Sequence, residues 1–251
     1  MKVVIIGSGN VATVLGRLFK KNGHEIIQVV SRNVDHAGIL AVEFGCPFAD
    51  NDGMTDQDGE VYLVAVSDGA LYNLNNSIHL DKKLVLHTAG SVPIDVLKDI
   101  SLNYGVLYPL QSLRKEMDYQ DDIPFLIDGN TEETKTLIED FAKTISANVV
   151  KASDDERLKL HVAAVIVSNF TNHLYALAED FCKQENIDFK LLSPLIKETA
   201  NRVAKVSPSA MQTGPAARND LFTLDKHLRL LANHPKLKYI YLKLTDSIMK
   251  G

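Results

Sequence analysis

The feature that most constrains the fold is a glycine-rich turn that joins an apolar run to an amphipathic one. Residues 2–6 form a continuous apolar run rich in β-branched side chains, which is typical of a strand buried on both faces of a parallel sheet. Residues 11–21 place apolar side chains at the i, i+3, i+4 and i+7 spacing of a helix. Between them lies the turn Gly7-Ser8-Gly9-Asn10-Val11-Ala12. This order predicts a dinucleotide-binding βα unit.

The residue types in the turn suit a pyrophosphate. A helix N-terminus offers backbone N–H groups without internal partners and a favourable dipole. Gly7 permits the tight turn, Gly9 permits close approach of the main chain, and Ala12 replaces the third glycine where helix and strand pack. The alternative is an ordinary strand–helix turn, because glycines mark many of these. We expect all six residues of the turn to contact the cofactor.

The remaining pattern predicts an α/β fold with two domains. Further buried-strand runs occur at 25–30, 61–66 and 84–87, weaker ones at 105–108, 125–127 and 149–150, and helical patterns at 35–44 and 131–145. Strands that alternate with helices predict a doubly wound, mostly parallel Rossmann sheet. From about residue 151 only helical patterns remain, over 154–184, 189–206 and 218–251. We therefore expect a dinucleotide-binding domain over 1–152 and an all-α domain over 153–251.

The loops after three predicted strands indicate which dinucleotide binds. Ser31-Arg32 follows the second strand, where NAD-preferring sites usually carry Asp or Glu, and a guanidinium suits the 2′-phosphate of NADP. This favours NADP over NAD, unless Arg32 is merely an exposed side chain. Two further loops are expected to flank the ribose and nicotinamide, namely Val66-Ser67-Asp68 and His87-Thr88-Ala89-Gly90. The alternatives are that Asp68 caps a helix and that His87 is a core residue.

Composition narrows the partners. A formal net charge of −5 argues against a general nucleic-acid binder. No run of 18 apolar residues occurs, so no transmembrane helix is expected, and the apolar start is too short for a signal-peptide core. Cys46 and Cys182 fit no metal or redox spacing, so no metal site is predicted. We expect a cytoplasmic protein that acts on a small-molecule substrate.

Candidate catalytic residues lie in the second half. Residues 162–167 are apolar all round, which predicts a central, buried helix. On a 3.6-residue period His161 shares one stripe with Ser168, and Asn169 lies beside it. Buried polar side chains need partners in the protein or in a ligand. His161 is thus a candidate acid or base and Asn169 a candidate for orienting a substrate, with internal hydrogen bonding as the alternative for both.

Several motifs together resemble those of a known group. They are the glycine-rich turn, His87-Thr88-Ala89-Gly90-Ser91, Tyr108-Pro109-Leu110-Gln111-Ser112, Leu160-His161-Val162-Ala163-Ala164 with Asn169, and Thr213-Gly214-Pro215-Ala216-Ala217-Arg218-Asn219-Asp220. The first half resembles the dinucleotide domain of the 6-phosphogluconate dehydrogenase superfamily, which includes pyrroline-5-carboxylate reductases. The whole chain resembles NADP oxidoreductases of unassigned substrate that carry a helical C-terminal domain of unknown function. The resemblance implies a homodimer formed through the helical domain and an active-site cleft between domains.

One departure from that superfamily concerns the proton donor. Several relatives carry a catalytic lysine on the helix that corresponds to 160–182, where this chain has Ala164 or its neighbours and no lysine. The proton donor is then expected to be His161 or an ordered water. Gln111 is a further candidate for the site, or alternatively bonds the backbone of its own turn.

Two functions remain open at this stage. The first is an NADP-dependent oxidoreductase that transfers hydride to or from a small carbonyl, imine or hydroxyl substrate. The second is a non-catalytic NADP-binding sensor or assembly protein. The glycine-rich turn supports both equally, the missing lysine favours the second, and the polar stripe with the superfamily resemblance favours the first.

Overall fold

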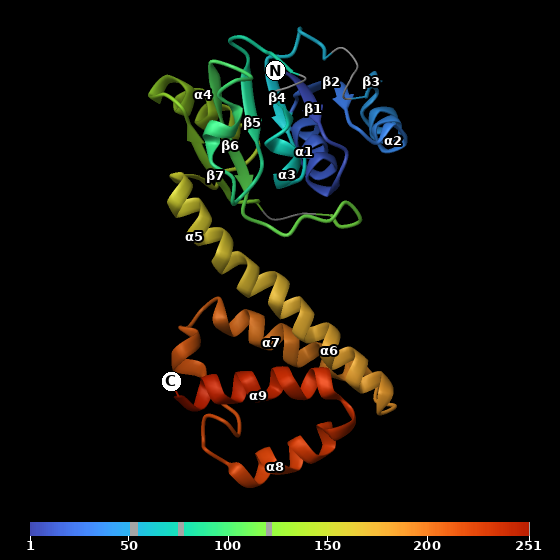
Figure 1. Ribbon diagram of the computed structural model, residues 1–251, viewed down its shortest axis with the longest axis vertical. Coiled ribbons are helices and arrows are strands. Elements are labelled where there is room, and N and C mark those ends of the chain that lie inside the picture. The colour runs from blue at the N-terminus through green and yellow to red at the C-terminus, as the bar shows by residue number, and fades with distance from the viewer. Residues whose placement is uncertain (51–54, 75–77, 119–121, 251) are drawn as a thin grey trace. The chain divides into compact units, whose positions relative to one another are not determined.

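A computed structural model describes residues 1–50, 55–74, 78–118 and 122–250 (Figure 1). Within these residues the sheet runs in the order β3-β2-β1-β4-β5-β6-β7-β8. Its strands are β1 (Lys2–Ile6), β2 (Glu25–Val30), β3 (Phe48–Ala49), β4 (Val61–Val64), β5 (Leu84–His87), β6 (Asn103–Pro109), β7 (Phe125–Gly129) and β8 (Val149–Lys151). Only the β6–β7 pair is antiparallel among these neighbours, which confirms the mostly parallel Rossmann sheet.

The strand order creates a topological switch point at β1. This strand pairs with β2 on one side and with β4 on the other, both in parallel. The chain therefore leaves β1 toward one half of the sheet and later returns to build the other half. Ligands of open α/β sheets bind at the carboxyl ends of the strands where this reversal occurs. The glycine-rich turn follows β1 at that point.

Helices cover both faces of the sheet, as the alternation of side chains along a strand requires. Val3 and Ile5 belong to one core, which includes residues of α1 (Asn10–Lys21), α2 (Val34–Phe44) and α4 (Glu132–Lys143). Val4 and Ile6 belong to a second core, with α3 (Asp68–Leu71) and the 3₁₀ helix Ile94–Leu97. In Figure 1, α1 and α2 are drawn in blue beside β1–β3.

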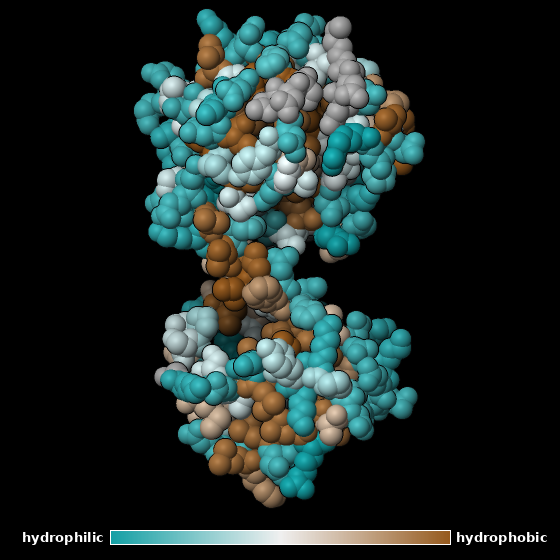
Figure 2. Space-filling model, viewed as in Figure 1, coloured by the Kyte–Doolittle hydropathy of each residue, from teal (hydrophilic) through white to brown (hydrophobic). Residues whose placement is uncertain are grey.

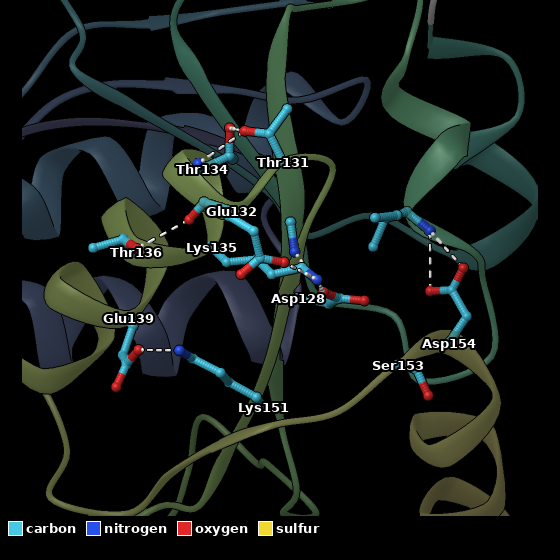
Figure 3. Close-up of polar contacts among 12 residues, drawn as sticks. Asp128, Thr131, Glu132, Thr134, Lys135, Thr136, Glu139, Lys151, Ser153 and Asp154 are labelled. Atoms are coloured by element: carbon cyan, nitrogen blue, oxygen red, sulfur yellow. Dashed lines mark hydrogen bonds and ion pairs between the residues drawn. The ribbon is translucent and has the colours of Figure 1, made fainter.

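Local capping determines where the helices begin. The Thr131 hydroxyl accepts the Thr134 N–H at 3.1 Å at the start of α4 (Figure 3). Farther along that helix, Glu139 forms an ion pair with Lys151 of β8 at 2.7 Å. α5 (Asp154–Ala164) begins with a capping box in which Ser153 and Glu156 satisfy each other's backbone N–H groups. These caps stop each helix from extending back into the preceding strand or loop.

After β8, every regular element among the described residues is a helix. After α5 come a π-helical segment (Val165–Phe170), α6 (Thr171–Gln184), α7 (Ser193–Val203), α8 (Leu221–Leu230) and α9 (Pro235–Lys250), with short 3₁₀ helices at Phe189–Leu192, Pro208–Met211 and Leu231–Asn233. The chain divides into two compact units, Met1–Ser168 and Asn169–Gly251. No helix among the described residues is both long and apolar enough to cross a membrane.

The expectation of a buried central helix at 162–167 is wrong for the single chain. Val162 is 55% exposed and Val167 is 71% exposed. The assumed 3.6-residue stripe is also interrupted, because the π-helical segment advances by i→i+5 hydrogen bonds rather than i→i+4. His161 and Asn169, on either side of this change, therefore do not keep the angular relation that an ideal helix predicts.

Two smaller differences concern the strands. β4 ends at Val64, so Val66 belongs to the loop rather than to the predicted strand. β3 spans only Phe48–Ala49, and two residues are too few to show an alternating pattern. Its place at the edge of the sheet comes from pairing with β2.

Substituting Gly105 is expected to destabilise the sheet. A Cβ atom there would lie 2.2 Å from the Asp128 carbonyl oxygen, on the backbone of β7. We expect Gly105→Ala to lower the free energy of unfolding by about 2–4 kcal/mol. Gly38→Ala in α2, where the new atom makes ordinary contacts with Phe48, should instead raise it by up to about 1 kcal/mol. Urea denaturation measures both, and equal stabilities would contradict the packing described.

Candidate functional site

Gly7 occupies a position that only glycine fits. Its φ is +123°, in the region that L-amino-acid side chains rarely adopt. Its N–H donates to the Val30 carbonyl of β2 at 2.7 Å, and a Cβ atom would lie 2.2 Å from the Ala65 carbonyl oxygen. The first residue of the turn is thus held between β2 and the loop after β4, at the switch point of the sheet.

Gly9 differs from Gly7, because it has room. It is the N-cap of α1 with a φ of −87°, and a Cβ atom there would meet nothing within 4 Å. The Thr13 N–H donates to the Gly9 carbonyl at 3.0 Å, so the N–H groups of residues 10–12 lie ahead of the first intrahelical bond. Ala12 is fully buried. A helix N-terminus beside open space is suited to an anion.

A cavity of 320 Å³ lies at this turn and takes in residues from three loops. Seven of its lining residues were predicted from the sequence to bind the cofactor, namely Gly7, Ser8, Gly9, Ser31, Arg32, Val66 and Ser67. The Ser8 and Ser31 hydroxyls are hydrogen-bonded at 2.8 Å, which ties the turn to the end of β2. A larger cavity of 600 Å³, lined by residues of α1 and by Met117, Asp118, Asp122, Ile123 and Ile145, contains none of the predicted residues.

Four further residues line the cavity without having been predicted: Ala65, Ala70, Asn73 and Leu74. Two of them follow the short helix α3, whose four residues are too few to show a helical period. The nearby motif Val66-Ser67-Asp68 was the only sequence signal that pointed to this wall of the cavity.

His87 is fully buried at the end of β5, as the core alternative expects. Its Nδ1 accepts the Ala89 N–H at 3.1 Å, so Nε2 carries the ring proton and has no hydrogen-bond partner among the described residues. Burial, and then the nearby positive charge of Arg157, lower the pKa of His87 to about 3. The ring is neutral across the physiological range, and its role toward a cofactor stays a prediction.

The loops after β4 and β5 are joined by a short hydrogen bond. The Ser91 hydroxyl donates to the Asp68 carboxylate. Ser67 occupies the N-cap position of α3 and Asp68 is the first helical residue, so Asp68 links the loops rather than capping the helix. Thr88, Ala89 and Gly90 are buried between His87 and this bond.

His161 is paired with a residue that sequence reasoning missed. The Tyr108 hydroxyl, from β6, lies 2.9 Å from His161 Nδ1, and the two rings meet edge to face. Gly90 packs against both, because a Cβ atom there would lie 2.6 Å from His161 Nδ1 and 3.0 Å from Tyr108 Cζ. The structure thus brings the His87–Gly90 loop together with His161.

Burial keeps the Tyr108 hydroxyl protonated. Burial raises the pKa of Tyr108, the Arg157 guanidinium lowers it, and the Asp68 carboxylate raises it, with burial the largest effect. The phenol therefore carries its proton throughout the neutral range. A phenol and an imidazole in contact can hold and pass on one proton.

The two remaining candidate catalytic residues are both exposed. Gln111 is exposed in the segment after β6, and Asn169 is exposed in the π-helical segment. Their catalytic roles stay predictions. Tyr108 was visible only as the first residue of the Tyr-Pro-Leu-Gln-Ser motif. Tyr108 and His161 are 53 residues apart in the chain, so no local sequence pattern indicates that they pair.

Two family models and several solved structures match this chain. Residues 2–90 match a family described as NADP oxidoreductase coenzyme F420-dependent, and residues 123–248 match a domain of unknown function, DUF2520. No curated protein sequence matches significantly. A protein from Bacteroides fragilis whose solved structure is named putative NADP oxidoreductase is 36% identical, over 100% of this chain and 98% of its own, with a TM-score of 0.94.

Two more distant solved structures share the fold. Protein TM1727 from Thermotoga maritima is 22% identical over 99% of this chain and 100% of its own, with a TM-score of 0.79. A reductive aminase from Aspergillus terreus, solved with NADPH and ethyl-5-oxohexanoate, is 14% identical over 99% of this chain and 93% of its own, with a TM-score of 0.71.

The buried neutral His87 makes stability depend on pH. Because its pKa falls from 6.5 in the unfolded chain to about 3 in the fold, the stabilisation is present above pH 6.5 and is lost as the pH falls toward 3. Between about pH 7 and about pH 5, the free energy of unfolding of the wild type should fall by about 2 kcal/mol more than that of His87→Gln. Urea denaturation at both pH values measures this difference.

The exposed His79 provides the control. His79→Gln should follow the wild-type pH dependence, since the surroundings of an exposed side chain change little on folding. If wild type and His87→Gln lost stability in parallel, a protonated His87 would be accommodated in the fold, and the buried neutral ring would be the wrong description.

Proposed function

The chain belongs to the family that joins an NADP oxidoreductase domain to the DUF2520 domain, and on that premise we propose that it is an NADP-dependent oxidoreductase. The proposed reaction is hydride transfer to or from a small carbonyl, imine or hydroxyl substrate. The cavity at the β1 switch point carries the proposal, because seven predicted cofactor residues line it.

The residues of this cavity fit a dinucleotide phosphate. The open direction at Gly9 and the N–H groups of residues 10–12 would hold the pyrophosphate at the start of α1. Arg32, exposed at the rim, would bind the 2′-phosphate through charge-assisted hydrogen bonds. Ser8 and Ser31 support this end of the site through their mutual hydrogen bond. When bound, the nicotinamide supplies or accepts the hydride.

The protein supplies the proton through Tyr108 and His161. In the reducing direction Tyr108 donates its hydroxyl proton to the substrate oxygen or nitrogen. His161 Nδ1–H then gives a proton to the phenolate oxygen 2.9 Å away, while His161 Nε2 takes up a proton from water. Tyr108 suits this role because burial keeps it protonated at neutral pH. The pair thus replaces the lysine that this chain lacks, and the loop of Gly90 holds it in place.

Arg32 is expected to discriminate between the two cofactors. Arg32→Ala removes the charge proposed to bind the 2′-phosphate, so the Kd for NADPH should rise by about 10- to 100-fold while that for NADH changes by less than about twofold. Gly9→Ala should weaken both cofactors equally, because its new methyl group occupies the pyrophosphate approach. Quenching and blue shift of reduced-cofactor fluorescence on binding measure both affinities. An equal loss of NADPH and NADH affinity in Arg32→Ala would remove the case for NADP.

Tyr108→Phe tests the chemistry. We expect kcat to fall by at least about 100-fold with the NADPH Kd unchanged, because only the proton donor is removed. His161→Asn should lower kcat by a smaller factor. Tyr104→Phe, on the same strand, loses only a hydroxyl bond to Asp95 and is the matched control. The assay follows NADPH oxidation with oxo-acids, imines and aldehydes as substrates.

The outcomes of that assay separate the candidate functions. Turnover that survives in Tyr108→Phe would exclude the proposed proton donor. An absence of turnover with every substrate class, despite tight NADPH binding, would favour the non-catalytic alternative of a sensor or assembly protein.

We further propose that the protein forms a homodimer through its helical region. The proposal is supported by large apolar side chains that the single chain leaves exposed on α5, the π-helical segment and α6, including Val162, Val167 and Phe170 (Figure 2). An apolar surface of this kind favours association with a second copy. Light scattering should give the mass of two chains, and Val167→Glu should shift it to one. A wild-type mass of one chain would exclude the dimer.

A further inference from the structure

Arg157 is the largest side chain that the described part of the protein buries completely, with 1% of its surface exposed. It lies near the start of α5, in a chain whose other arginines are not among its fully buried side chains. Removing a guanidinium from water is unfavourable unless its charge and its N–H groups find partners. The position therefore calls for a reason beyond filling space.

Arg157 and Asp154 together grip one short segment of backbone. Arg157 Nη2 donates to the Val92 carbonyl oxygen at 2.5 Å and to Asp154 Oδ1 at 2.7 Å. The Asp154 carboxylate in turn accepts the Ile94 N–H at 3.2 and 3.3 Å (Figure 3). Pro93, between them, has no N–H to offer. The first turns of α5 thus hold the backbone on both sides of Pro93, and we call these two side chains the α5 clamp.

The α5 clamp holds the backbone next to a loop that contacts the proposed proton donor. Residues 88–92 join β5 to the clamped backbone, and Gly90 within them packs against both His161 and Tyr108. His161 follows Arg157 by four positions on α5, so the two side chains lie on the same side of the helix. One helix face therefore carries both the clamp and a member of the pair that the clamped loop contacts.

The charge of Arg157 also reaches the pair. Three charged or titratable groups act on Tyr108: Arg157 and His161 from α5, and Asp68 from the start of α3. Arg157 also acts on the neutral His87 of β5. Arg157 lowers the pKa of Tyr108 and Asp68 raises it. Arg157 Nε and Nη1 and His87 Nε2 are buried N–H groups without an acceptor among the described residues. The guanidinium charge is thus only partly compensated close to the phenol.

We propose that Arg157, with Asp154, is a positioning residue that holds residues 88–92 against the Tyr108–His161 pair and sets the reactivity of the Tyr108 hydroxyl through its charge. This inference rests on the proposed function for its catalytic meaning. Arg157 acts through the loop and through Tyr108 and does not itself contact the substrate. Its two effects are separable, since lysine keeps the charge but is shorter than arginine, so its Nζ does not reach the position from which Nη2 bonds both Val92 and Asp154.

The first experiment needs no substrate. The absorbance change on ionisation of Tyr108, taken as the difference between each protein and the same protein with Tyr108→Phe, gives the midpoint of the phenol. Arg157→Met should raise this midpoint by at least about 0.5 pH unit, because the stabilising cation is removed. Arg157→Lys should leave it close to the wild-type value. Lys159→Met, which removes an exposed cation from the same helix, is the control and should leave it unchanged.

Hydrogen exchange of the amides in residues 88–94 tests whether the α5 clamp restrains this backbone. Arg157→Met, Arg157→Lys and Asp154→Asn should each speed exchange by at least about tenfold, because each breaks or weakens a bond to this backbone. If Arg157→Met does not fold, Arg157→Lys and Asp154→Asn still carry the test. Exchange at the wild-type rate in these two variants, or an unshifted Tyr108 midpoint in a folded Arg157→Met, would overturn the proposal.

Turnover then connects the clamp to the reaction. With an accepted substrate, Arg157→Met should lower kcat by about tenfold, leave KM for NADPH unchanged and move the alkaline limb of the kcat profile upward. Arg157→Lys should restore the limb but only part of kcat. If Arg157→Met and Arg157→Lys lowered kcat equally and the alkaline limb of the kcat profile did not move, Arg157 would have only a structural role. If the spectroscopic and exchange effects appear while Tyr108→Phe keeps full activity, the clamp stands and the proposed proton donor fails.

Discussion

The close approach of Gly7 to the Ala65 carbonyl is the contact on which the candidate site depends. β1 lies between β2 and β4, and the chain after β1 must leave the sheet where both neighbouring strands end. A side chain at Gly7 would occupy the position of that carbonyl, 2.2 Å away. With the turn held there, the Ser8 hydroxyl meets Ser31 and the start of α1 faces the cavity. Three loops from different strands are thereby assembled around one space.

Further along the same edge of the sheet, the loop after β5 is held by buried polar groups rather than by a close approach of glycine. His87 is held neutral by burial and by the nearby Arg157, while Arg157 gives its hydrogen bonds to a backbone carbonyl and to Asp154. These arrangements are costly for stability, since several donors have no acceptor among the described residues. Such a cost is typical of functional sites. It is concentrated where the loop after β5 meets Tyr108 and His161.

The sequence grouped the residues that line the cavity at β1, whereas it did not pair Tyr108 with His161, and the reason is distance along the chain. The strand, turn and helix around Gly9 are consecutive, so their relation is written in local spacing, as are the helix starts at Thr131 and Ser153. Tyr108 and His161 are brought together only by the packing of α5 against the β5 and β6 ends. The π-helical segment likewise has no distinctive local composition, and it removed the ideal period on which the predicted stripe of His161 and Asn169 relied.

By itself the sequence determined the doubly wound sheet, the helices that follow it and the glycine-rich turn after β1, because each follows from hydrophobic period and from the backbone freedom of glycine. Only the tertiary structure decided the state of the polar side chains. It made His87 a neutral core residue, gave His161 the partner Tyr108, and turned Arg157 from one helical cation among several into a buried link between α5 and the loop of Gly90. Protonation and partnership depend on burial and on neighbours from distant segments, and neither is recorded in local sequence.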